Sequence, residues 1–169
     1  ISPDEIETAV DEVVKGNYTL DKRFLLELDV KGKYFSDGRF ALNEIAVQKT
    51  DSSSMITIHA SVNGNFLNTY WADGLIVSTP TGSTAYSLSC GGPIVMPDSD
   101  NFVITPIATH NLNVRPVIIS SQDEVTLEVE GRNPNYLVSL DSRSESISSS
   151  CKLKIKKAGF QIFLVKLHD

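Results

Sequence analysis

The chain has 169 residues, of which 41% are hydrophobic, and a formal net charge of −6. This length fits one domain of about 100–200 residues with a single core. The acidic balance excludes the broad basic surface used to bind nucleic acid or an anionic membrane, so we expect no nucleic acid and no membrane partner. With no run near the roughly 20 apolar residues of a membrane helix and no signal peptide at the start, we expect a cytoplasmic protein.

Cysteine and histidine usage predicts no metal site. Cys90 and Cys151 are too few for a disulfide framework and lack the spacings typical of zinc sites, so we expect two small buried thiols. His59 belongs to an alternating strand, and His110 is expected to orient a loop beside Arg115. Neither histidine is expected to bind a metal.

The first predicted element is a short amphipathic helix. Ser2 and Pro3, followed by two acidic residues, form a helix-start signal, and Gly16-Asn17 forms the stop. One apolar stripe lies between them, at Ile6, Val10, Val13 and Val14.

Almost everything after this helix is predicted to be β-strand, because β-branched and apolar residues come in short runs divided by turn residues. The expected strands cover residues 24–30, 34–35, 40–47, 55–62, 66–70, 75–79, 102–107 and 116–119. Asp37-Gly38 and Asn63-Gly64-Asn65 predict hairpin turns. Alternating strands follow, with a turn at Gly159, while the serine-rich stretches 51–54 and 142–150 are expected as loops or edge strands. The fold class is therefore mainly β, a two-layer antiparallel sandwich-like domain.

One segment interrupts the strand pattern. A Pro80-Thr81-Gly82-Ser83 turn after the strand 75–79 predicts a short helix that starts at Ser83 or Thr84 and stops at Gly91-Gly92. Free N–H groups in its first turn, a close approach allowed by Gly82 and the neighbouring hydroxyls would suit an anionic or polar ligand. An ordinary capped strand-to-helix turn is the alternative.

The exact residues of this segment carry a family resemblance. Residues 73–89 read Asp-Gly-Leu-Ile-Val-Ser-Thr-Pro-Thr-Gly-Ser-Thr-Ala-Tyr-Ser-Leu-Ser and run into Gly-Gly-Pro, which closely resembles the long signature of the NAD kinase family. Five further short segments of this chain resemble shorter markers of the family: Asn43-Glu44, Thr105-Pro106-Ile107, His110, Arg115-Pro116 and the Ser139-Leu140-Asp141-Ser142 turn. The resemblance spans residues 1–169, as the carboxy-terminal, β-rich, NAD-binding domain.

The resemblance implies transfer of a phosphoryl group from ATP, or from polyphosphate, to the adenosine 2′-hydroxyl of NAD, with a divalent cation, Mg²⁺. It also implies homodimers or homotetramers, and a separate amino-terminal α/β domain whose Gly-Gly-Asp-Gly motif supplies the general base. This sequence contains no Gly-Gly-Asp-Gly. We therefore expect no catalytic residue in this chain, and binding of NAD without turnover.

The resemblance also implies which residues contact NAD. Glu44 would accept two ribose hydroxyls, Asn43 would contact a base or a phosphate, and Asp73 would be a second acidic contact. The nucleotide pocket would be lined by Thr84, Ala85, Tyr86, Ser87, Leu88 and Ser89. Arg143, which stands where relatives often have glutamine, would contact a phosphate.

Each of these residues has a structural alternative. Asn43 and Glu44 could be a strand-end hydrogen-bonding pair, Asp73 a turn former, Tyr86 a core residue and Arg143 a solvated loop cation. For the whole chain, the alternatives are a lipid or diacylglycerol kinase domain and a non-catalytic oligomerisation module. The sequence contains no Gly-x-Ser-x-Gly elbow of a serine hydrolase. It also contains no P-loop and no Gly-x-Gly-x-x-Gly fingerprint of a Rossmann site.

Overall fold

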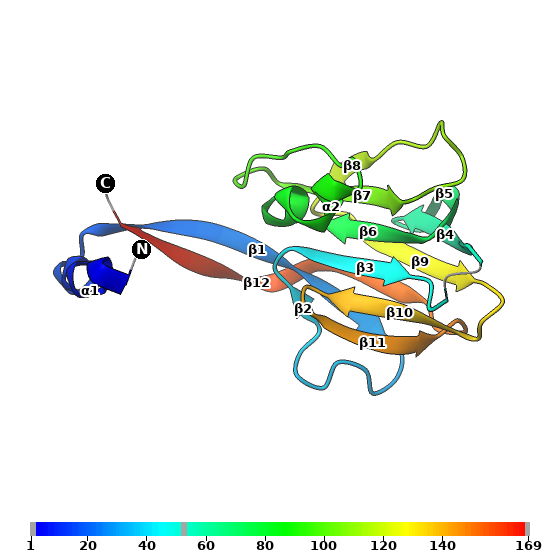
Figure 1. Ribbon diagram of the computed structural model, residues 1–169, viewed down its shortest axis with the longest axis horizontal. Helices are drawn as coiled ribbons and strands as arrows, with labels where there is room; N and C mark the ends of the chain where they lie inside the picture. Colours follow the sequence, from blue (N-terminus) through cyan, green and yellow to red (C-terminus); the bar gives the residue numbers. More distant parts are fainter. Residues whose placement is uncertain (1–2, 52–53, 168–169) are drawn as a thin grey trace.

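The computed structural model of the protein describes residues 3–51 and 54–167. Two six-stranded sheets pack face to face, and a long two-stranded arm extends from one of them (Figure 1). In both sheets every paired strand is antiparallel, which confirms the predicted fold class. No helix in the described part of the chain has the length and apolar character needed to cross a membrane.

The two sheets are built from strands that are far apart in sequence. The first sheet runs in the order β2 (Phe40–Ala41), β1 (Tyr18–Val30), β12 (Leu153–Leu167), β9 (Val125–Glu130), β4 (Ile56–Val62) and β5 (Asn65–Ala72). The second sheet runs in the order β11 (Arg143–Ser148), β10 (Asn135–Leu140), β3 (Glu44–Gln48), β6 (Gly74–Ser78), β7 (Asn101–Ile107) and β8 (Val117–Ser120).

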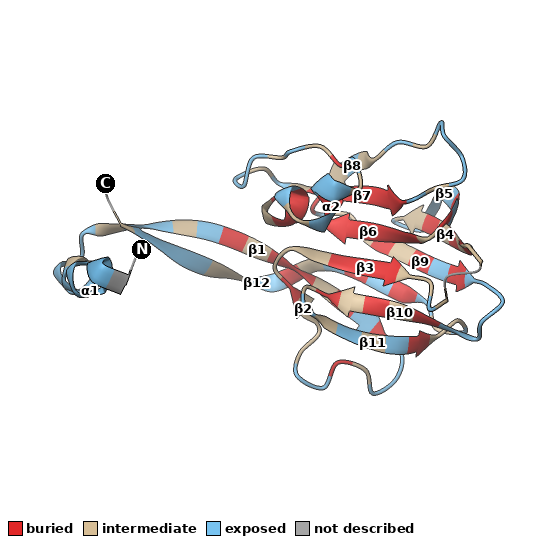
Figure 2. Cartoon of the chain, viewed as in Figure 1, coloured by how far each residue is buried: buried red, intermediate tan, exposed pale blue. Residues whose placement is uncertain are grey.

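The core lies between the sheets because each strand places alternate side chains inward. In β9, Val125, Leu127 and Val129 are buried, and in β3 Ile45 and Val47 are fully buried. These side chains join one continuous cluster that both sheets supply. Figure 2 shows buried residues concentrated in the sandwich and exposed residues along most of the outer arm.

The sequence predicted one of the two hairpins correctly. Asn63 and Gly64 connect β4 to β5 with φ of 50° and 77°, the positive values that this tight turn requires. The hairpin at Asp37-Gly38 is wrong: residues 34–35 form no strand, and β2 pairs with β1 instead. Phe35 has a φ of 53° and its N–H donates to Glu145 Oε1 at 2.7 Å, so an edge-strand carboxylate holds this loop.

The arm consists of the outer halves of β1 and β12, with the helix α1 (Ile6–Lys15) at its tip after a 3₁₀ turn (Pro3–Glu5) (Figure 1). The helix and its stop are confirmed, because Gly16 has a φ of 79° and donates to the Val13 carbonyl. Ser2 lies outside the described residues. The predicted turn at Gly159 is wrong: β12 continues through it, and its two extra residues are taken up in an irregularity between the pairs Phe24–Gln161 and Leu26–Lys157.

Cys90 and Cys151 are partly buried rather than buried, and each lies at the edge of a hydrophobic cluster. The serine-rich stretch 142–150 forms the edge strand β11, as one of its two predicted alternatives. Ser52 and Ser53 of the other serine-rich stretch lie outside the described residues.

Candidate functional site

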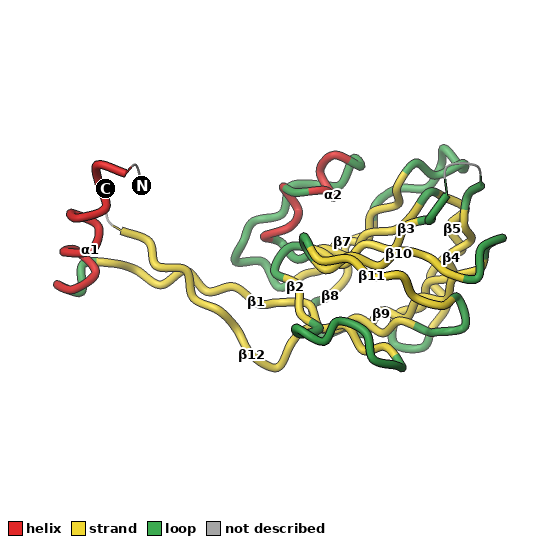
Figure 3. Tube along the Cα trace, turned by 60° about the horizontal axis from the view of Figure 1, so that its bottom comes forward, coloured by secondary structure: helices red, strands yellow, loops and turns green. Residues whose placement is uncertain are grey.

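The candidate site lies on the face of the second sheet that points away from the core. Glu44, Ala46 and Gln48 share this face because they alternate with the buried Ile45 and Val47. The 3₁₀ turn η2 (Thr81–Thr84) and the helix α2 (Tyr86–Ser89) lie over the same face (Figure 3). Beneath them, a small cluster forms from Ala46, Ile76, Ile107 and Cys90. The candidate site is therefore the outer face of the second sheet, partly covered by residues 81–89 of the signature segment.

A backbone bend at Asn43 places Glu44 on this face of the sheet. The Asp141 carboxylate accepts the backbone N–H groups of Leu42 and Asn43 at 2.8 Å each and of Glu44 at 3.1 Å. Asp141 itself has a φ of 52°, and its N–H donates to the Glu44 carbonyl. One carboxylate at the end of β10 thus fixes the start of β3.

Gly82 holds the signature turn against this bend. A Cβ at position 82 would lie 2.1 Å from the Asn43 carbonyl oxygen, so only glycine fits. The Thr79 hydroxyl donates to the Leu42 carbonyl at 2.7 Å and accepts the Gly82 N–H at 3.1 Å. Glycine at position 82 therefore permits packing against Asn43, and the close approach of a ligand there stays a prediction.

The predicted helix is shorter than the sequence indicated. A 3₁₀ turn covers Thr81–Thr84, Ala85 breaks the helical path with φ −96° and ψ −129°, and α2 has only four residues. The Ser83 hydroxyl is buried, donating to the Pro80 carbonyl at 2.7 Å and accepting the Val95 N–H at 3.0 Å. Ser83 therefore builds the turn and is not available to a ligand.

Glu44 is the most chemically distinctive side chain of the site. Burial, with a smaller contribution from the negative charge of Asp141, raises the pKa of the Glu44 carboxyl. Its Oε2 atom is buried and accepts no hydrogen bond from the described residues. The Ser78 hydroxyl, on the residue paired directly with Glu44, is likewise buried and has no partner within that part of the chain. Two neighbouring buried polar groups thus have unused hydrogen-bonding capacity toward the described residues.

Tyr86 shares this face with Glu44. Gln48, four residues after Glu44 on β3, donates through Nε2 to the Tyr86 hydroxyl at 3.2 Å. Burial is the main cause that raises the pKa of Tyr86. Asp73 lies just before β6, at the end of the β3–β6 pair where Gln48 pairs with Gly74. Its Oδ1 forms a 2.6 Å ion pair with Lys49. The structure thus places Glu44 at one end of this sheet face and Tyr86 and Asp73 near its Gln48 end.

The remaining predicted residues divide into two groups. Thr84, Leu88 and Ser89 are exposed and Ala85 is partly exposed, whereas Ser87 is buried with its hydroxyl 2.8 Å from that of Thr105. Arg143 has backbone partners in the segment before Leu42. Its guanidinium donates to the carbonyls of Gly38 at 2.7 Å and of Phe40, so it fastens β2 and the end of the loop before it to β11.

The sequence did not single out Gln48, Lys49 or Ser78. Gln48 and Lys49 followed the predicted strand 40–47, Ser78 was one residue of the signature, and only the pairing of β3 with β6 shows how they are placed. Asp141 was noted as part of a turn, but nothing local showed that its carboxylate reaches residues almost 100 positions earlier.

Metal ligands do not gather in the described residues: no group of three His, Cys, Asp or Glu side chains could hold an ion there. His59 contacts Thr69 through Nδ1, and the ring of His110 packs against Trp71 with centroids 4.6 Å apart. The contact of His110 is therefore with Trp71, whereas Arg115 donates to the carbonyls of Leu112 and Val114.

Sequence comparison identifies relatives along nearly the whole chain. Residues 42–167 match the family described as the ATP-NAD kinase C-terminal domain. An NAD kinase of Cytophaga hutchinsonii is 57% identical over 98% of this chain, and one of Bacteroides fragilis is 49% identical over the same share. This chain spans 57% of the length of each of those proteins.

Two solved structures have the same fold. The yeast NADH kinase complexed with NADH superposes with a TM-score of 0.86 at 26% identity, over 98% of this chain and 49% of that chain. The NAD kinase from Archaeoglobus fulgidus in complex with ATP gives a TM-score of 0.82 at 27% identity, over 96% of this chain and 61% of that one.

Proposed function

Because this chain belongs to the ATP-NAD kinase C-terminal domain family, we propose that it is the NAD-holding part of an NAD kinase. In the reaction, the adenosine 2′-hydroxyl oxygen of NAD forms a bond to the γ-phosphorus of ATP. The bond from that phosphorus to the bridging oxygen of ADP breaks, and the hydroxyl proton leaves to a base. The products are NADP and ADP, and the catalysis depends on positioning and charge stabilisation.

The observation that best supports this proposal is the buried Oε2 atom of Glu44, which has no hydrogen-bond partner among the described residues. The buried hydroxyl of Ser78, on the paired residue, has none there either. A carboxylate can accept two hydrogen bonds from a ribose diol, and the bend locked by Asp141 presents it in a fixed direction. Asn43 would contact the base or a phosphate, and Tyr86 would stack on the base with its partly exposed ring. Asp73 would supply the second acidic contact.

The general base and most of the ATP site would lie in a second part of the enzyme. The divalent cation would come with ATP, because Mg²⁺ is commonly held through substrate phosphates and a few carboxylates. This chain alone is then expected to bind NAD with little or no formation of NADP.

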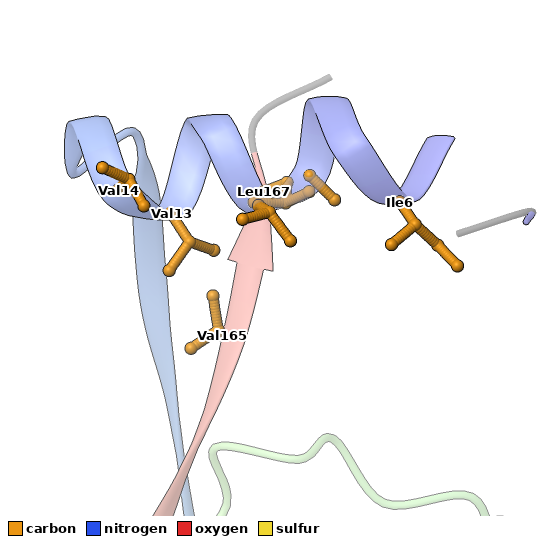
Figure 4. A pocket seen from close by; sticks show the side chains of 7 residues that line it. Ile6, Val13, Val14, Val165 and Leu167 are labelled. Carbon is orange, nitrogen blue, oxygen red and sulfur yellow. The ribbon is translucent and has the colours of Figure 1, made fainter. Parts of the chain in front are cut away.

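The apolar tip of the arm gives that second part a surface to pack on. Seven apolar side chains line one pocket there: Ile6, Ala9, Val10, Val13, Val14, Val165 and Leu167. Val13 and Val165 point toward each other across it (Figure 4). No described residue of α1 is buried. Since this chain spans only 57% of its Cytophaga relative, we infer that an amino-terminal α/β domain covers this face.

Calorimetric titration tests the proposal. NAD should give a saturable heat with the wild-type chain, and Glu44→Ala should abolish it because the ribose loses its acceptor. Glu128→Ala, on the outer face of the first sheet, is the matched control and should leave the affinity unchanged. Absence of any saturable heat with the folded wild-type chain, as a pure oligomerisation module would give, contradicts the proposal.

Substrate identity is tested in the longer protein. ATP and NAD should yield NADP, while diacylglycerol should remain unphosphorylated. Phosphorylation of the lipid in place of NAD would assign the alternative kinase class.

A further inference from the structure

Gln48 shares a strand with Glu44 and a hydrogen bond with Tyr86, two residues that the proposed function assigns to NAD. It lies four residues after Glu44 on β3 and therefore on the same outer face. Its Nε2 donates to the Tyr86 hydroxyl at 3.2 Å, although the two residues are 38 positions apart in sequence. Tyr86 is 36% exposed, so packing alone restrains its ring only in part.

The sheet leaves room for this contact. Gly74 is the residue on β6 that pairs with Gln48, and a Cβ there would lie 2.2 Å from the Val47 carbonyl oxygen. Position 74 therefore has to be glycine, and no side chain rises from β6 beside Gln48. The Gln48 side chain can then reach across to α2.

The next residue makes an equivalent contact. Lys49 forms a 2.6 Å ion pair with Asp73, and its backbone N–H donates to the Asp73 carbonyl at 3.0 Å. Two consecutive residues at the end of β3 thus restrain two side chains, Tyr86 and Asp73, that the proposed function assigns to NAD.

We propose that Gln48 is a positioning residue for NAD, which orients the Tyr86 ring through its hydroxyl toward the ligand held by Glu44. The proposal rests on the proposed function. Gln48 itself acts through Tyr86, so its effect should depend on the tyrosine hydroxyl being present.

A double-mutant cycle measures that dependence. Gln48→Leu should weaken NAD binding about three- to ten-fold, the range expected when one partly exposed hydrogen bond is lost. Tyr86→Phe should have an effect of similar size, and the double variant should bind no more weakly than Tyr86→Phe alone. Gln161→Leu on the arm makes the same chemical change away from the site and should bind NAD like the wild type. Gln48→Ser, tested identically, replaces Gln48→Leu if leucine disturbs folding.

A spectroscopic signal separates positioning from a general structural role. With ¹³Cζ-labelled tyrosine, the Tyr86 resonance, assigned by its loss in Tyr86→Phe, should shift in Gln48→Leu. The other four tyrosines of the chain should keep their positions.

The outcomes are distinct. If the wild type binds NAD but Gln48→Leu binds equally well, or if the two single effects add in the double variant, the positioning role is refuted. If the folded wild type does not bind NAD at all, the proposed function fails first.

Discussion

Asp141→Asn perturbs the bend that presents Glu44. The carboxylate accepts three N–H groups, two on Oδ1 and one on Oδ2, whereas an amide has one acceptor oxygen. In the better orientation, asparagine keeps Asn43 and Glu44 as donors and turns its own NH₂ toward the Leu42 N–H. One charge-assisted bond is lost and two are weakened, which together destabilise the fold by about 2–4 kcal/mol. Asparagine tolerates the positive φ of 52°, so strain adds little.

Urea denaturation followed by circular dichroism measures this loss directly. Asp37→Asn, in the exposed loop before β2, is the matched control and should change the unfolding free energy by less than about 0.5 kcal/mol. Asp141→Asn should also weaken NAD binding, because the Glu44 carboxylate is no longer held. If its stability stays within about 0.5 kcal/mol of wild type and NAD affinity is unchanged, the reasoning about this bend is wrong.

Three further changes probe the site and the arm. Gly82→Ala places a methyl group 2.1 Å from the Asn43 carbonyl oxygen, so urea denaturation should show a loss of about 1–3 kcal/mol and calorimetry weaker NAD binding; wild-type values would contradict the packing argument. The pKa of Glu44 is higher in the folded chain than in the unfolded chain, because burial disfavours the ionised carboxylate. The free energy of unfolding therefore falls as the pH rises from the unfolded to the folded pKa. Glu44→Gln should therefore be more stable than wild type at pH 7, with the difference vanishing below about pH 4, and equal melting temperatures at pH 7 would contradict this. Val13→Asp, on the exposed face of α1, should change the stability of this chain by less than about 0.5 kcal/mol yet impair NADP formation by the longer protein; full activity there would argue against domain packing on that face.

The sequence predicted most of the strands because alternation is a local signal. Val125, Leu127 and Val129 are buried as their spacing indicated, and the Asn63-Gly64 turn forms as its residues require. The Asp37-Gly38 hairpin failed because Glu145, more than 100 residues later, holds the loop, and no local pattern contains that contact.

The site divides in the same way. Glu44 and Tyr86 were found through motif resemblance, and the structure places them on one face. Their supports, Asp141 and Gln48, depend on which strands pair across the second sheet. The short helix was overestimated, since the sequence between Ser83 and Gly91 contains no signal for the break at Ala85.

Mapping NAD onto the backbone by ¹H–¹⁵N NMR tests the central claim most directly. Addition of NAD should shift the amide signals of Asn43, Glu44, Asp73 and residues 84–89, and leave those of the arm and of β4 and β5 in place. Shifts confined to the first sheet or to the arm, with the Glu44 and Tyr86 signals unmoved, would contradict the claim that the outer face of the second sheet holds NAD.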